Sequence, residues 1–361
     1  MKIICGPGGH DGCGFMRIYW PYMHLPEHTV RFTDIAQPAM WCEYDLAVVQ
    51  RVSTPDMLFM LEQLKAHNVP VIMDFDDNIH AMTPDNPAST EYGTGKPMTN
   101  LFEKALGMVD IVTASTADLA KEYARFRPDI VVCENFLLRT HIDEFAPAAF
   151  TGAPKREGEV RIGYAAGIAH TADLFSITKP LRKVFAQYPE AKLVLFGMEI
   201  PWGRIPAEFQ GRIEFHLGME PGDDELPTDY MRRYYAKVAS LDLDIGLAPL
   251  TPSVFNKCRS FLKALEYGML GVPVVATRFG PFRDYENRGG SILTCGEDRD
   301  WIANIGNLIR NEELRGRMAQ MNFRWVSDNH TEETAMASWR KVLEKVGGAG
   351  GELRSPSPTT V

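Results

Sequence analysis

The segment Asp244–Thr277, DIGLAPLTPSVFNKCRSFLKALEYGMLGVPVVAT, decides the fold of this 361-residue chain. Its apolar run Ile245–Ala248 predicts a buried strand, and Val272–Ala276 predicts a second one. Between them, Arg259–Met269 has apolar residues at helical spacing and predicts an amphipathic helix. A strand, a loop, a helix and a strand in this order are typical of a parallel sheet that is covered by helices.

The same alternation extends over most of the chain. In the first half the predicted strands are Lys2–Cys5, Leu46–Gln50, Val69–Met73, Ile111–Ala114 and Ile130–Cys133, and the predicted helices are Met57–Ala66, Leu101–Leu106 and Ala117–Phe126. In the second half the further strands are Val160–Tyr164, Leu193–Phe196, Ile213–Phe215 and Ile292–Thr294, and the further helices are Leu174–Gln187, Tyr230–Ser240, Trp301–Ile309, Glu313–Val326 and Glu332–Lys345.

The polar segment Pro147–Glu159 interrupts this alternation and indicates a linker. We therefore expect an α/β chain of two doubly wound, Rossmann-like domains that face each other across a cleft, with bounds 1–150 and 151–330. A final helix over 331–346 is expected to cross back to the first domain. The tail 347–361, rich in Gly, Ser and Pro, is expected to be disordered.

Composition narrows the function classes. The net charge of −9 and the pI of about 5.6 disfavour a protein that coats nucleic acid, although a local basic cleft stays open. No apolar stretch approaches the ~18 residues of a membrane span, and Met1–His10 does not resemble a signal peptide. The six cysteines show neither CxxC nor zinc spacing, which indicates reduced thiols. These features favour a cytoplasmic protein.

A glycine-rich loop, Cys5–Gly14 (CGPGGHDGCG), follows the first predicted strand. The amides of Gly8 and Gly9 are candidates to approach an anion or a sugar closely. The alternative is a turn without a ligand. The dinucleotide pattern GxGxxG is absent because Asp11 stands at its third glycine, so a nicotinamide-dependent dehydrogenase is weakly supported.

An acidic cluster, Asp74–His80 (DFDDNIH), follows another predicted strand. At the carboxyl end of a strand, such side chains can supply a base, orient sugar hydroxyls or bind a divalent cation. The alternative is a solvated turn that caps the next helix. Asp76 and His80 are the candidates for catalysis.

The predicted helix Arg259–Met269 carries Arg259, Lys263 and Glu266 at spacings of four and three residues, which places them on one helix face. Two cations suit a diphosphate, and the carboxylate suits a ribose diol. The expected start of this helix, Asn256–Ser260, would add free amides and a positive dipole end. The alternative is a surface helix with internal salt bridges.

These residues carry a resemblance. Asp244–Thr277 resembles the donor-binding core of GT-B-fold retaining glycosyltransferases, the large glycogen-synthase-like group, in a subgroup common in bacteria and phages. The likeness covers roughly residues 1 to 345. Its weaker parts are Gly8–Gly9 with Gly14–Arg17, Asp74–Asp77, Val112–Thr116, Asn135, Gly163–Gly167 with His170 and Asp173, and His330 with Thr331.

The resemblance implies transfer of a sugar from a nucleotide-diphosphate sugar to an acceptor hydroxyl, with retention, without a bound metal and with no cofactor besides this co-substrate. It places the acceptor on the first domain and the donor on the second, where Glu266 would bind the ribose. The candidate donor-binding residues are Gly8, Gly9, Gly167, His170, Asp173, Asn256, Ser260 and Glu266, and the candidate catalytic residues are His80, Asp76, Lys263 and Arg259.

The chain departs from the family pattern at two places. Cys258 stands where the family has a first glutamate, eight residues before the ribose-binding one. The family's Arg and Lys after the first strand of the second domain are also missing, and His170 and Asp173 occupy this region. The sequence therefore does not identify the donor sugar. A nucleotide-sugar epimerase and a non-catalytic nucleotide-sugar-binding protein stay as alternatives.

The acceptor is open as well: a saccharide, a lipid-linked saccharide, a small metabolite or a modified DNA base. His10 and Arg17 are further candidates on the acceptor side, and Trp202, Arg204, Arg232 and Arg233 are candidates for contacts with DNA. The apolar and aromatic segment Arg17–Pro26 is either a membrane contact or, in the ordinary interpretation, a buried helix.

Overall fold

The computed structural model describes residues 1–9, 12–147, 150, 152–198, 207–222, 225 and 227–349. The chain divides into two compact units. Unit 1 consists of Met1–Asp76, Gly95–Glu134 and the segment from Glu332 onwards, and unit 2 consists of Asp77–Thr94 and Asn135–Thr331.

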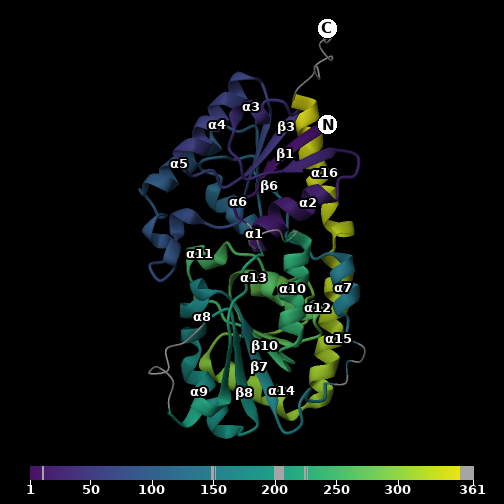
Figure 1. Cartoon of the computed structure of the whole chain (residues 1–361). Helices are drawn as coiled ribbons and strands as arrows, with labels where there is room; N and C mark the ends of the chain where they lie inside the picture. Colours follow the sequence, from purple (N-terminus) through teal and green to yellow (C-terminus); the bar gives the residue numbers. More distant parts are fainter. Residues whose placement is uncertain are drawn as a thin grey trace. The chain divides into compact units, whose positions relative to one another are not determined.

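Unit 1 contains one parallel sheet of six strands in the order β2-β1-β3-β4-β5-β6 (Figure 1). The strands are β1 (Lys2–Gly6), β2 (Thr29–Phe32), β3 (Leu46–Gln50), β4 (Val71–Phe75), β5 (Ile111–Ala114) and β6 (Val131–Val132). Strands β1, β3, β4 and β5 are almost wholly buried, as continuous apolar runs predict. The helices of unit 1 are α1 (Gly12–Gly14), a π-helix (Phe15–Tyr19), α2 (Trp20–Met23), α3 (Pro38–Trp41), α4 (Pro55–Ala66), α5 (Pro97–Leu106), α6 (Ala117–Tyr123) and α16 (Glu332–Ala349).

Unit 2 contains a second parallel sheet of six strands in the order β12-β11-β10-β7-β8-β9. The strands are β7 (Val160–Ala165), β8 (Ala191–Phe196), β9 (Ile213–His216), β10 (Ile245–Ala248), β11 (Val274–Thr277) and β12 (Leu293–Cys295). The helices are α7 (Arg139–Phe145), α8 (Thr171–Ser176), α9 (Thr178–Gln187), α10 (Pro227–Ala239), α11 (Val254–Lys257), α12 (Leu262–Met269), α13 (Gly280–Asn287), α14 (Asp298–Arg310) and α15 (Glu312–Asn329). The predicted α/β class with two parallel sheets is confirmed.

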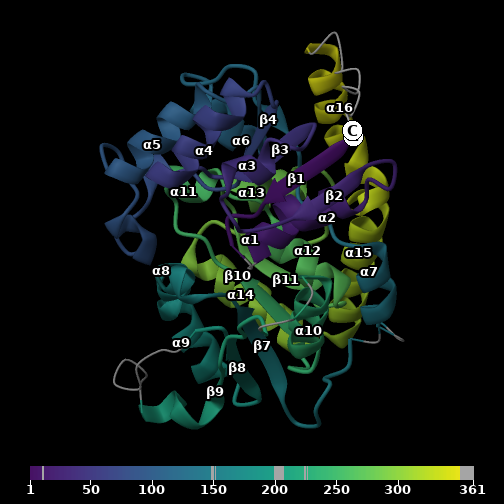
Figure 2. The same cartoon turned by 45° about the horizontal axis from the view of Figure 1, so that its top comes forward.

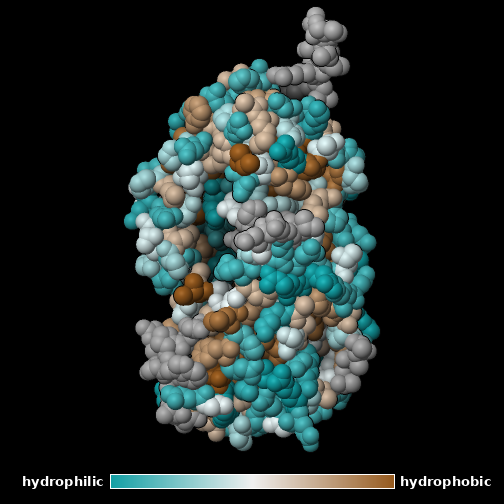
Figure 3. Space-filling view, in the orientation of Figure 1, coloured by the Kyte–Doolittle hydropathy of each residue, from teal (hydrophilic) through white to brown (hydrophobic). Residues whose placement is uncertain are grey.

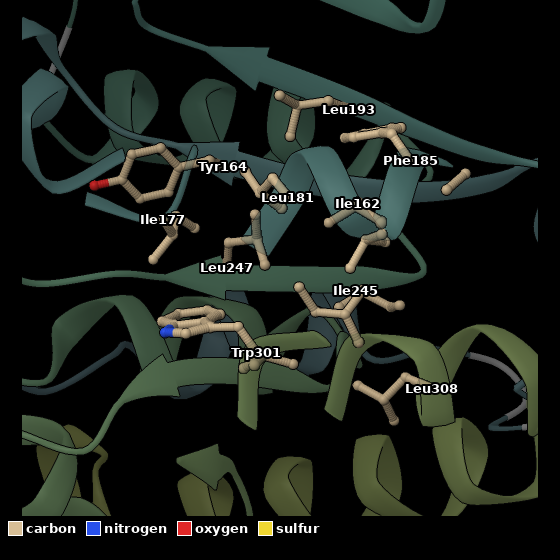
Figure 4. Packing of buried hydrophobic residues seen from close by; sticks show 14 of the residues in the cluster. Ile162, Tyr164, Ile177, Leu181, Phe185, Leu193, Ile245, Leu247, Trp301 and Leu308 are labelled. Atoms are coloured by element: carbon tan, nitrogen blue, oxygen red, sulfur yellow. The ribbon is translucent and has the colours of Figure 1, made fainter. Parts of the chain in front are cut away.

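The main core of unit 2 lies on one face of its sheet. Helices α9 and α14 pack against each other over this face. Leu181 of α9 and Trp301 of α14 cover Ile162, Ile245 and Leu247 of the central strands (Figure 4). Alternate residues of the same strands point to the opposite face.

The structure differs from the expected elements at β2 and at the helix expected over Leu174–Gln187, among other places. Strand β2 was not predicted, because Thr29–Phe32 is a half-exposed edge strand without a continuous apolar run. The helix expected over Leu174–Gln187 is two helices, α8 and α9, which meet at Ile177. Buried Ile177 belongs to the core, so the apolar spacing continues across the break.

The chain leaves unit 1 earlier than the expected linker. The second segment of unit 2 begins at Asn135, whereas the first domain was expected to end at residue 150. The Asn135 amide donates to Ser260 Oγ at 3.0 Å, and Leu137 forms a bridge with Thr331. These contacts attach the segment before Pro147–Glu159 to unit 2.

Helix α16 groups with unit 1, although it follows unit 2 in the chain. Trp339 of α16 packs edge-on against Tyr22 of α2, with ring centroids 5.9 Å apart. Figure 2 shows α16 beside α2 within this unit. The segment Arg17–Pro26 is therefore mostly buried under α16, as the ordinary interpretation of its apolar side chains predicts.

No helix in the described ranges is long and apolar enough to cross a membrane. The face drawn in Figure 3 is largely hydrophilic, and its apolar side chains form separate small groups.

A charge network joins strands β7, β8 and β9. The buried guanidinium of Arg161 binds Glu214 through two hydrogen bonds of 2.9 and 3.0 Å. Lys192 Nζ lies 3.1 Å from Glu214, and His216 Nε2 lies 2.6 Å from it. Hydrogen bonds from Arg161, with those of His216 and Lys192, hold the pKa of Glu214 well below its usual range.

We predict that Glu214→Gln lowers the free energy of unfolding by about 1.5–3 kcal/mol at neutral pH, the range for hydrogen bonds to charged groups. Because the pKa of Glu214 is lower in the folded protein, its contribution is full above the unfolded value of about 4.3 and disappears as the pH falls below it. Urea denaturation between neutral and acidic pH measures this. A deficit of the variant that stays constant down to low pH would contradict the assignment.

Candidate functional site

A glycine of β10 allows α12 to approach the sheet of unit 2. A Cβ atom on Gly246 would lie 2.7 Å from Cδ2 of Tyr267 in α12. A Cβ atom on Gly163 of β7 would lie 2.3 Å from Leu243, which precedes β10. The Tyr267 ring fills the space over Gly246, and its hydroxyl accepts a hydrogen bond of 2.9 Å from the Ala165 amide. This contact fixes α12 at the carboxyl end of β7, where parallel sheets bind ligands.

Lys263 and Glu266 of α12 lie at this strand end. Lys263 Nζ donates to the carbonyl oxygen of Ala165, the last residue of β7. It also lies 3.3 Å from Glu266 Oε2. The Glu266 side chain is only 10% exposed and that of Lys263 20% exposed, so a cation and a carboxylate share one mostly buried position.

Asp173 links the loops that follow β7 and β10. Its Oδ1 accepts hydrogen bonds from the Thr251 amide at 2.7 Å and from Asn256 Nδ2 at 3.1 Å. Its Oδ2 lies 3.0 Å from His170 Nδ1. The two loops leave neighbouring parallel strands, so Asp173 holds both of them at the same edge of the sheet.

The pKa values of Asp173 and His170 depend on burial and on the groups around them. Burial opposes ionisation of Asp173, but the hydrogen bonds from His170 and Thr251 outweigh it and lower the pKa of the carboxyl. Burial lowers the pKa of the His170 imidazole, and the positive charge of Arg259 lowers it further. Asp173 is thus a carboxylate and His170 a neutral ring at neutral pH.

The expected single helix over Arg259–Met269 is wrong. Arg259 and Ser260 lie between α11 and α12, and α12 begins only at Leu262. The break lets Phe261 pack against the rings of Tyr285 and His330. Arg259 is therefore not on a shared helix face with Lys263 and Glu266, and the helix start expected at Asn256–Ser260 does not exist.

The three residues around this break nevertheless stay at the site. Arg259 stacks over the Phe255 ring, with its guanidinium carbon 5.3 Å from the ring centroid. Asn256 in α11 binds Asp173, and Ser260 accepts from Asn135. The carbonyl of Gly167 accepts from the His170 amide and closes the loop after β7.

The segment Asp77–Thr94 brings part of the acidic cluster to unit 2. Asn78 is buried, and its Nδ2 lies 3.5 Å from Cys258 Sγ. His80 lies in the short 3-10 helix Ile79–Ala81, which packs against α11. His80 thus belongs to the same unit as Lys263 and Asp173.

The remaining acidic residues stay in unit 1. Asp74 is fully buried and binds the Arg17 guanidinium at 3.0 and 2.7 Å and Thr113 Oγ1 at 2.6 Å. The expectation that Arg17 serves the acceptor is wrong, because its side chain is 0% exposed and is held by Asp74 and the Cys133 carbonyl. Asp76 Oδ1 is buried and has no hydrogen-bond partner among the described residues. No set of three or more His, Cys, Asp or Glu side chains in the described ranges is arranged to hold a metal ion.

The glycine loop after β1 is held from two sides. The Gly8 amide donates to Gln50 Oε1 at 2.8 Å, so this donor is already used within the protein. A Cβ atom on Gly14 would lie 2.0 Å from the Gly9 carbonyl oxygen. Gly14 is thus required for the close contact between the loop and the helix that follows it.

We predict that Gly14→Ala costs about 1–3 kcal/mol, because backbone must move to accept the methyl group. Its control is Gly12→Ala in the same short helix, where no described heavy atom lies within 4 Å of the added Cβ. The control should be neutral or stabilising by up to about 1 kcal/mol. Thermal unfolding compares the two; equal stabilities would show that the loop contact is unimportant.

Several residues that were candidates for DNA or acceptor contacts either form ion pairs within the protein or lie outside the described residues. Arg232 is paired with Glu144, and Arg233 with Glu225. The other candidates, His10, Trp202 and Arg204, lie outside the described residues, as does most of the expected tail 347–361.

Sequence reasoning missed Thr251, Tyr267 and Gly197 at this site. Gly197 has a φ of +86°, and a Cβ atom there would lie 2.8 Å from the Ala166 carbonyl oxygen at the loop after β7. A glycine directly after the apolar strand Leu193–Phe196 is a usable signal for such a turn. The roles of Thr251 and Tyr267 depend on a backbone amide and on a distant strand end, which no local pattern shows.

The sequence and the structure were compared with those of known proteins. No protein-family model and no curated protein matches the sequence. Among solved structures, a glycosyltransferase from Rickettsia africae matches with a TM-score of 0.62 at 12% identity, over 96% of this chain and 98% of that one. HepE from Anabaena in complex with UDP-glucose matches with a TM-score of 0.60 at 14% identity, over 95% and 99% of the two chains.

The chain has the GT-B fold. In this fold, unit 2 is the second Rossmann-like domain, and the Lys263–Asp173 cluster lies at the carboxyl ends of its strands. A third match is a putative UDP-N-acetylglucosamine 2-epimerase from Listeria monocytogenes, with a TM-score of 0.52 at 13% identity over 100% and 99% of the chains. At these identities the likeness shows the fold, which both classes of enzyme share.

Proposed function

We propose that this protein is a glycosyltransferase that moves a sugar from a nucleotide-diphosphate sugar to an acceptor hydroxyl, with retention and without a bound metal. The observation that carries the proposal is the cluster at the carboxyl ends of β7 and β10. There, the mostly buried Lys263 and Glu266 lie beside the polar loops that Asp173 joins.

Each part of the donor has a chemical counterpart in this cluster. Lys263 and Arg259 supply positive charge for the diphosphate, and the amides and hydroxyl around Ser260 add hydrogen bonds. Glu266 can accept both hydrogen bonds of a ribose diol once Lys263 turns from it to the phosphates. The two cations would stabilise the leaving diphosphate directly, which removes the need for a metal ion.

Retention without a protein nucleophile requires the diphosphate to leave from the face that the acceptor attacks. The C1–O bond breaks, the acceptor oxygen bonds to C1, and the acceptor proton passes to the leaving phosphate oxygen. No protein base is then required. His80 and Asp76 are proposed to orient the acceptor, since both follow the strand end of β4.

The first donor to test is UDP-glucose, because HepE binds it on the same fold. A thermal-shift screen with UDP-glucose, GDP-mannose and ADP-glucose, with magnesium or with a chelator, tests binding and metal independence together. A donor at 100 times its dissociation constant adds about 2.7 kcal/mol, which is a shift of a few degrees. Proton NMR of the product with saccharide acceptors then reports the anomeric configuration. Absence of a shift with all three would contradict the proposal.

A nucleotide-sugar epimerase is the second candidate, supported by the epimerase match and by the hydrogen-bonded pair His170–Asp173. Incubation of UDP-N-acetylglucosamine without an acceptor distinguishes the two. Formation of an epimer of the donor supports the epimerase, whereas transfer that requires an acceptor supports the transferase. Binding without either reaction would indicate a non-catalytic protein. A modified DNA base is an alternative acceptor for the same transfer assay.

A further inference from the structure

The His170 imidazole in the proposed donor cluster is hydrogen-bonded through one of its two ring nitrogens. Nδ1 lies 3.0 Å from Asp173 Oδ2, and Nε2 makes no hydrogen bond to any described residue. The side chain is 20% exposed, so the ring is mostly covered but still reaches the surface. Asp173 is itself fixed by Thr251 and Asn256, which makes the orientation of the imidazole rigid.

The charges that face this ring come from three elements. Asp173 belongs to α8, Arg259 to the link between α11 and α12, and Lys263 to α12. The two cations disfavour a positive charge on the ring, whereas Asp173 favours it. Burial and the two cations together outweigh the effect of Asp173. The pKa of His170 therefore lies below its ordinary value in the protein without a donor.

We propose that His170 is a proton-linked ligand of the donor diphosphate: on donor binding it takes one proton from solvent and donates Nε2–H to a phosphate oxygen. This inference rests on the proposed function. The negative diphosphate offsets the charges of Arg259 and Lys263, so the barrier to protonation of the ring disappears. Asp173 then stabilises the imidazolium through Nδ1–H.

Linkage gives a measurable consequence. If binding takes up a proton, the donor affinity rises as the pH falls, by up to tenfold per pH unit. The window lies between the pKa of His170 in the free protein, below about 6.5, and its raised value in the complex. Above and below this window the affinity is independent of His170 protonation.

Isothermal titration calorimetry with UDP-glucose in PIPES and in Tris measures the proton uptake at about pH 7. UDP-glucose is suitable because its phosphates do not titrate near neutral pH, so any uptake belongs to the protein. If GDP-mannose or ADP-glucose binds more tightly in the screen above, it replaces UDP-glucose. We expect uptake that approaches one proton, and its loss in His170→Gln with binding retained. The matched control is His67→Gln, an exposed histidine at the end of α4, which should leave the uptake unchanged.

The outcomes separate the two proposals. Binding of the sugar nucleotide without proton uptake, or uptake that persists in His170→Gln, overturns this inference and leaves the transferase proposal intact. Failure of all three sugar nucleotides to bind overturns both. A purely structural role of His170 would change the thermal stability and leave the proton count unchanged.

Discussion

Replacing Arg17 by methionine is expected to lower the free energy of unfolding of unit 1 by about 3–5 kcal/mol. Arg17 and Asp74 form a bidentate ion pair in which both side chains are 0% exposed. Methionine removes the positive charge and leaves the Asp74 carboxylate buried, with Thr113 as its one remaining side-chain partner among the described residues. The guanidinium also stacks on Trp339 at 5.0 Å, so the change loosens α16 as well.

Hydrogen exchange of peptides that cover β1 and β4 measures this effect locally, with urea denaturation for the whole chain. The control is Arg340→Met, which breaks an ion pair with Glu27 whose side chains are about half exposed and should cost under about 1 kcal/mol. Equal losses in the two variants would refute a special role of the buried pair. The double variant Arg17→Met with Asp74→Leu should recover part of the loss, because no unpaired charge then stays buried.

Lys263→Ala is expected to lower kcat/KM for the donor by about 100-fold, or about 2.7 kcal/mol of transition-state stabilisation. The ammonium group lies at the carboxyl end of β7, where the proposed diphosphate would take the place of the Ala165 carbonyl as its partner. The loss should appear in kcat as well as in donor affinity, because the negative charge on the phosphate grows as the glycosidic bond breaks.

The control for this variant is Lys179→Ala in α9 of the same unit. Its side chain is 76% exposed and paired with Asp298, so its removal should leave the donor kinetics unchanged. Donor hydrolysis and transfer assays measure both variants after the donor screen has identified the nucleotide. An unchanged kcat/KM in Lys263→Ala would remove this residue from the mechanism.

Much of the candidate site could be predicted because its residues are close in sequence. Lys263 and Glu266 are three residues apart on one helix, and the helix follows a buried strand. Glycine, proline and apolar runs around Ile245–Ala248 and Val272–Ala276 predict this strand and helix order by themselves. Helical periodicity could not show the break before Leu262, because Phe261 satisfies the apolar spacing whether or not the helix continues.

Pairings across the chain were decided by the tertiary structure alone. The acidic residues Asp74 and Asp76 look alike in sequence, yet Asp74 lies against Arg17 from 57 residues earlier and serves the core. Likewise, Asp173 was a candidate from its likeness to a family loop, but its partner Thr251 contributes only a backbone amide, which carries no sequence signal.

The amino-acid sequence by itself determined the α/β class, the two parallel sheets and the types of side chain at the strand ends, because hydrophobic periodicity and turn chemistry act over a few residues. The tertiary structure decided which charges are buried as core pairs and which lie at the candidate site. It also decided that Asp77–Thr94 belongs with unit 2. Such choices depend on burial and on partners far apart in the chain, and the energy of a charge depends on those surroundings rather than on its neighbours in sequence.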